Sequence, residues 1–126
     1  MKPNHAGNPE IKDAILAYAQ CEKVKSGLIW MCQLADQVAA MDHPGKQHAM
    51  ILLKTLASMV ADESHLAGRI IADPQWHAIG KKINLALVMI ESGVPQETGY
   101  HLGHALTQVT RISGQAAARL EDDGLF

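Results

Sequence analysis

Residues 73–95 read DPQWHAIGKKINLALVMIESGVP. The stretch begins with Asp73 before a proline, the arrangement of a helix N-cap followed by proline at the first helical position. Apolar residues then recur at the three- and four-residue spacing that places them on one face of a helix: Trp76, Ile79, Ile83, Ala86, Leu87 and Ile90. Residues 92–95 end this helix, with Gly93 as a left-handed C-terminal residue and Pro95 opening the next helix. Because the turn is short, we expect the two flanking helices to be antiparallel neighbours.

Similar signals divide the rest of the chain. Asn8 and Pro9 repeat the cap-plus-proline pattern near the start, and residues 42–45, DHPG, carry the chemistry of a turn. The resulting helices cover residues 9–41, 45–72, 74–92 and 95–121, with short flexible termini on either side. No segment alternates with the two-residue period of a strand. The sequence therefore predicts an all-α protein, a single four-helix bundle-like domain that is oligomeric.

Composition and charge narrow the function classes. Of 126 residues, 48% are hydrophobic but only one is Phe, two are Trp and two are Tyr, so the core must be aliphatic. Eleven basic against 13 acidic residues give a formal net charge of -2, whereas binding to nucleic acid requires an excess of positive charge.

No apolar run is long enough to span a bilayer, and no apolar leader segment opens the chain. Cys21 and Cys32 would lie roughly 16 Å apart on one helix, too far for a disulfide. We expect a cytoplasmic protein that binds neither nucleic acid nor membranes.

The apolar pattern exceeds what one core can bury. A bundle helix needs one apolar stripe, yet residues 9–41 carry a second one, and residues 50–53 point around the whole circumference of their helix. One alternative is that the surplus apolar surface is hidden within the bundle, by a central helix wrapped by the others or by a bent helix. Another alternative is that a different protein or an apolar ligand covers it. We expect instead a homo-oligomer, in the simplest case a homodimer, formed near the turn at residues 42–45. The residues predicted to supply the contact are Trp30, Leu34, Met41, Met50 and Leu53.

Glu63 is a charged residue within an apolar stripe of the helix expected over residues 45–72. It falls within an apolar stripe that an uninterrupted helix would turn toward the core: Leu52, Leu56, Met59, Leu66 and Ile70. One interpretation is that its carboxylate reaches outward to solvent or pairs with a lysine or arginine. The other is a ligand-binding carboxylate in an apolar pocket, a setting that raises its pKa and supports acid-base chemistry.

Known catalytic patterns are missing, and we assign no catalytic residue. The chain has no phosphate-binding glycine loop, no zinc-protease motif and no nucleophile elbow. Two spacings among the seven histidines could hold a metal ion, Asp62-X-X-His65 and His101-X-X-His104. The first lacks the further ligands of a bundle metal site, and the second faces away from the inward side of its helix, so we expect no metal or cofactor. The leading hypothesis is a non-enzymatic interaction module that acts as an adaptor, regulator or assembly factor. The alternatives are a small-molecule-binding or enzymatic bundle using Glu63, and histidine phosphotransfer through His65.

Overall fold

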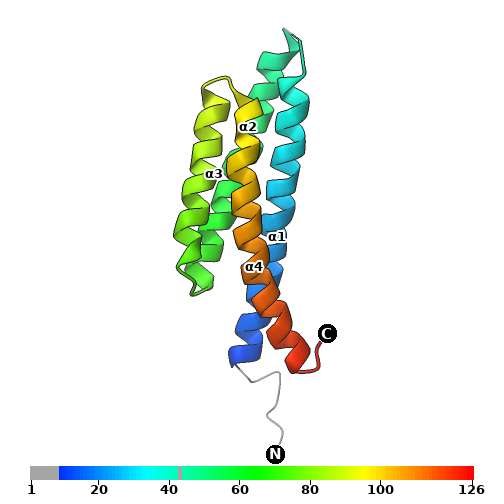
Figure 1. The fold of residues 1–126 in the computed structure, drawn as a ribbon, viewed down its shortest axis with the longest axis vertical. Helices are drawn as coiled ribbons and strands as arrows, with labels where there is room; N and C mark the ends of the chain where they lie inside the picture. Colours follow the sequence, from blue (N-terminus) through cyan, green and yellow to red (C-terminus); the bar gives the residue numbers. More distant parts are fainter. Residues whose placement is uncertain (1–8, 43) are drawn as a thin grey trace, which may run out of the picture.

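Four α-helices make up nearly all of the computed structural model, which describes residues 9–42 and 44–126 (Figure 1). They are α1 (Pro9–Ala39), α2 (Gly45–Ile70), α3 (Gln75–Glu91) and α4 (Thr98–Asp122), with a short 3-10 helix, η2 (Pro95–Glu97), before α4. No strand occurs within the described ranges, so the predicted all-α class is confirmed. Each helix ends within three residues of the predicted bounds. The expected flexible N-terminus and His43 of the predicted turn lie outside the described residues.

The turn between α3 and α4 has the predicted chemistry. Gly93 has a φ of 80°, a left-handed conformation that side-chain-bearing residues rarely adopt. The amide of Val94 donates to the carbonyl of Met89 and closes the end of α3. At the other end of α3, Asp73 Oδ1 accepts a hydrogen bond of 2.8 Å from the amide of Gln75, which caps the helix.

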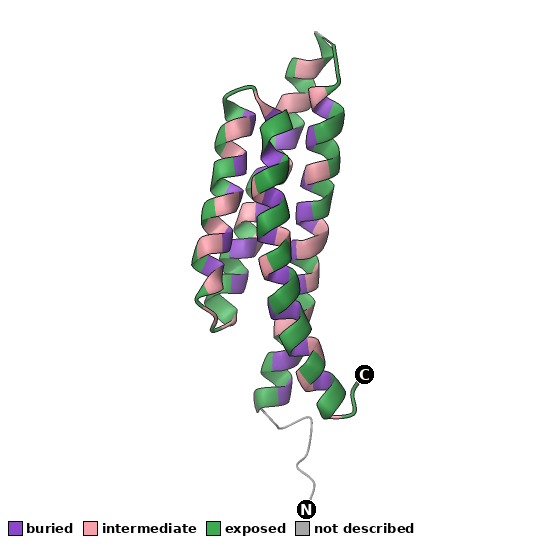
Figure 2. Cartoon of the chain, in the orientation of Figure 1, coloured by how far each residue is buried: buried purple, intermediate pink, exposed green. Residues whose placement is uncertain are grey.

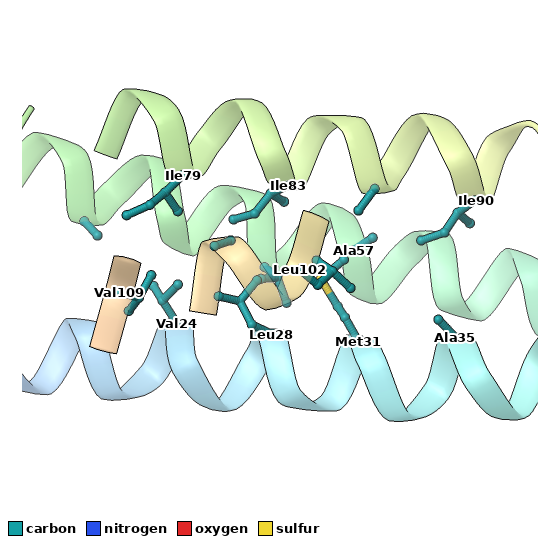
Figure 3. Close-up of a cluster of buried hydrophobic side chains, with 14 of the residues drawn as sticks. Val24, Leu28, Met31, Ala35, Ala57, Ile79, Ile83, Ile90, Leu102 and Val109 are labelled. Atoms are coloured by element: carbon teal, nitrogen blue, oxygen red, sulfur yellow. The ribbon is translucent and has the colours of Figure 1, made fainter. Parts of the chain in front are cut away.

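The helices are arranged as an antiparallel bundle in which each packs against its neighbours in the chain and α4 returns to α1. The core is formed by one stripe from each helix, including Leu28 of α1, Ala57 of α2, Ile83 of α3 and Leu102 of α4 (Figure 3). The stripe predicted for α3 is buried except for Leu87, which is half-buried. The three- and four-residue spacing predicts an inward stripe on α4 as well, and it is buried except for the half-buried Leu106: Leu102, Leu106, Val109, Ile112, Ala116 and Leu120. These stripes hold the four helices in one core.

The first turns of α1 and the last turns of α4 extend together beyond α3 (Figure 1). This two-helix stem has its own small cluster of Ile11, Ala14 and Leu120, packed against Tyr18. Arg119 forms an ion pair of 2.6 Å with Glu10 across the stem. With fewer neighbours, the stem buries fewer residues than the four-helix part (Figure 2).

The orientation of α2 differs from the prediction. Its inward stripe consists of smaller residues than expected: Leu53, Ala57, Val60, Ser64 and Ala67. The stripe predicted to face the core is exposed at Leu52, Met59, Leu66 and Ile70, and only Leu56 is half-buried. Small side chains allow the α2 backbone to approach the other helices closely. At the contact with α1, a Cβ added at Gly27 would lie 2.8 Å from Cγ2 of Val60.

This contact gives a stability prediction. Gly27→Ala gains about 1 kcal/mol of helix propensity but forces a methyl group into Val60, at an overpacking cost of about 1–3 kcal/mol. We expect a net loss of about 1 kcal/mol in the free energy of unfolding, measured by urea denaturation. Gly114→Ala is the control, because a Cβ there meets nothing within 4 Å, and it should stabilise the protein. Equal stabilisation by both substitutions would show that α1 and α2 are not in tight contact at Gly27.

Candidate functional site

Large apolar side chains line the outer side of the α1 and α2 pair. They are between 39% and 72% exposed, and we call this surface the α1–α2 face: Leu16, Trp30, Leu34, Met41, Leu52, Met59, Leu66 and Ile70. The register of the two helices is set by Lys23 opposite Glu63 and by Gly27 against Val60. This register places Leu34 level with Leu52. The face therefore runs along both helices for roughly 35 Å.

A small open hollow of about 130 Å³ lies in the middle of this face. Its walls are mainly apolar and come from both helices: Lys23, Val24, Gly27, Trp30, Leu56, Met59, Val60 and Glu63. Gly27 contributes no side chain to it, whereas Trp30 and Met59 contribute large ones. The hollow is smaller than the roughly 300–1,000 Å³ of typical small-molecule pockets.

Glu63 lies at the edge of this hollow and is paired within the chain. Its Oε1 is 3.0 Å from Nζ of Lys23, and its Oε2 accepts a hydrogen bond of 2.8 Å from Nε2 of Gln20. The side chain is 31% exposed. Hydrogen bonds from Gln20 and Lys23 lower the pKa of the carboxyl group, against a smaller raising effect of burial. The structure therefore agrees with the first interpretation of Glu63, a carboxylate that pairs with a lysine. It contradicts the raised pKa of the second interpretation.

The predicted contact residues divide between the surface and the core. Trp30, Leu34 and Met41 lie on the α1–α2 face, whereas Met50 is half-buried and Leu53, at 1% exposure, belongs to the core. Leu53 is thus not available as a surface contact in this bundle. The prediction missed Leu16 and the exposed residues of α2, although their apolar stripe is evident in the sequence. That stripe carries larger side chains than the stripe of α2 that packs in the core.

A second hollow, about 680 Å³ and open to solvent, lies between α2 and α3. We call it the α2–α3 groove. Asp62, His65 and Arg69 line it from α2, and His77 and Lys81 line it from α3. Small residues, including Ala61, Gly68 and Gly80, also line it. His65 is exposed there, and Lys81 of α3 lines the same groove.

The remaining candidates form no reactive cluster. His101 and His104 both lie beside the ring of Tyr100, at centroid distances of 5.4 and 4.5 Å. No three His, Cys, Asp or Glu side chains come together as a metal site within residues 9–42 and 44–126. Cys21 and Cys32 are free thiols, and burial is the main cause that raises the pKa of Cys21 to about 11. A thiol with a raised pKa forms little thiolate and is a poor nucleophile.

Comparisons with known proteins identify no relative. No protein-family model, curated protein or solved structure matches the chain. None of the helices in the described part of the chain is both long and apolar enough to cross a bilayer. The proposals below therefore depend on the geometry of this chain alone.

The ion pair of Glu63 predicts a pH dependence. A carboxyl group whose pKa is lower in the folded chain stabilises the fold above its ordinary pKa, here 4.5. This contribution disappears as the pH falls through the lowered pKa. Wild type should therefore exceed Glu63→Gln in stability at neutral pH by less than about 1 kcal/mol, since exposed ion pairs contribute little. The difference should vanish in acid when unfolding is measured across pH.

Glu121→Gln is the matched control, because Glu121 is exposed and its carboxylate forms no ion pair with a described residue. It should show no such pH-dependent difference. Glu63→Leu tests the same pair more severely and should change stability by less than about 2 kcal/mol. A larger loss would mean that Glu63 is buried and partnered more deeply than this geometry allows.

Proposed function

We propose that this protein is a non-enzymatic interaction module that acts as a homodimer, with the α1–α2 face as its interface. The observation that carries the proposal is the row of large apolar side chains left exposed on that face. Trp30, Leu52 and Met59 are each more than half exposed. Exposed apolar patches of several hundred Å² usually mark an interaction surface.

Charge and symmetry favour a second copy as the occupant. The two charges in the middle of the face, Lys23 and Glu63, already neutralise each other within one chain. A dimer therefore leaves neither of these charges without its partner at the interface. Both ends of the face are apolar, with Leu16 and Ile70 at one end and Met41 at the other. A two-fold axis through the middle of the face places each end of one copy against the other end of the second copy. Apolar side chains then meet apolar side chains at both ends of this isologous interface.

The middle of the face also carries residues suited to an interface. A standard interface buries about 800 Å² per partner, centred on a few aromatic or aliphatic anchor residues. Trp30 and Met59 stand beside the central hollow and are suited to this role. By contrast, the hollow is too small and too open to favour the alternative of a small-molecule pocket at Glu63.

In the dimer we propose, the outer surfaces of α3 and α4 stay free to bind another protein as an adaptor, regulator or assembly factor would. Leu85 and Val88 of α3 are about half exposed and lie outside the α1–α2 face. The free thiols of Cys21 and Cys32 suit a reducing compartment, so we place the protein in the cytoplasm.

The proposal predicts a particle of twice the 13.6 kDa chain mass at micromolar concentration, measured by sedimentation equilibrium. The double variant Leu52→Glu/Met59→Glu should weaken dimerisation by about 100-fold or more, because it places four carboxylates in the apolar interface. Leu85→Glu/Val88→Glu is the control, since it makes a similar change on exposed residues of α3. A monomeric wild type, or equal weakening by both variants, would exclude the α1–α2 face as the interface.

A further inference from the structure

We propose that the α2–α3 groove binds a small oxyanion, that is, a ligand with phosphate or carboxylate groups. At about 680 Å³ the groove is within the size range of small-molecule sites. It lies on a different side of α2 from the α1–α2 face. The proposal therefore does not depend on dimer formation.

The nitrogen-bearing side chains gather in the middle of the groove. Lys54 faces Glu91 and Gly68 lies against Trp76, and these two contacts set the register of α2 and α3. In this register His65 is level with Lys81, and Arg69 is level with His77. The four residues thus occupy a stretch of roughly 6–8 Å along the helices, which is the size of a diphosphate or dicarboxylate.

The two carboxylates of the groove lie toward its ends. Asp62 is nearly one turn before His65 on α2, and Asp73 is in the loop before α3. Asp73 is already engaged as a cap, through its hydrogen bond from the amide of Gln75. A ligand in the middle of the groove is therefore nearer to the nitrogen-bearing side chains than to these carboxylates.

The cations of the groove are available to a ligand. Neither Arg69 nor Lys81 forms an ion pair with another residue in the described part of the chain, unlike Lys23, Lys25, Lys54 and Arg119. A guanidinium group binds two oxygens of one phosphate or carboxylate, and a lysine adds a flexible point charge. The imidazoles of His65 and His77 provide further hydrogen-bond donors.

Room for the ligand comes from Gly80, a small residue placed opposite a large one. The register sets Gly80 against His65. A Cβ at Gly80 would meet nothing within 4 Å, so the space beside Gly80 in the groove is open. An oxyanion placed there contacts groups from both helices.

The test is a titration of the ¹⁵N-labelled protein with pyrophosphate and with succinate at constant ionic strength, followed by amide chemical shifts. At least one of these probes should cause saturable shifts concentrated in residues 61–84. Arg69→Gln/Lys81→Gln should weaken that binding about tenfold or more, because each lost contact is a charge-assisted hydrogen bond. Both residues are exposed, so the variant should keep the dispersed amide spectrum of the folded protein.

Lys12→Gln/Arg111→Gln is the matched control, because it removes the same formal charge from exposed positions on α1 and α4. It should bind as wild type does, as should Leu52→Glu/Met59→Glu, which alters only the α1–α2 face. The absence of saturable shifts with both probes would overturn the proposal. So would equal weakening by the groove variant and the control.

Discussion

The close approach of α1 and α2 at Gly27 and Val60 is the contact on which the surfaces of this protein depend. It allows the small residues of α2, such as Ala57 and Ala67, to face the core. Once α2 is turned in this way, its larger apolar residues lie about 100° away from the core stripe and reach the surface. The exposed face is therefore a consequence of tight packing inside the bundle.

The α2 helix contributes residues to three different environments. One stripe packs in the core, the next joins α1 to form the apolar α1–α2 face, and a third lines the polar groove with α3. Glu63 lies between the first two, and its ion pair with Lys23 neutralises the charge that an apolar interface would otherwise bury. His65, only two residues later, faces the groove. A single helix thus separates an apolar surface from a polar one.

Sequence reasoning predicted the positions of the helices well, because capping residues and turn glycines act locally. Asp73 and Gly93 perform the roles expected of them. It failed for α2, where two apolar stripes compete and the choice depends on how closely another helix can approach. That Gly27 allows α1 to approach Val60 of α2 is evident only from the packing of the two helices. The α2–α3 groove was also missed, because His65 and Lys81 are distant in sequence and meet only through the register of two helices.

The most direct test of the proposed interface uses Trp30 as a reporter. Trp30 is 57% exposed on the α1–α2 face, whereas Trp76 is 5% exposed in the core. Trp76→Phe keeps an aromatic ring in the core and removes an indole N–H that has no acceptor among the described residues. The emission of the remaining Trp30 should then shift to shorter wavelength as protein concentration rises, in parallel with the particle mass. Emission typical of a solvent-exposed indole at every concentration, in a protein that is nonetheless dimeric, would contradict the proposed interface.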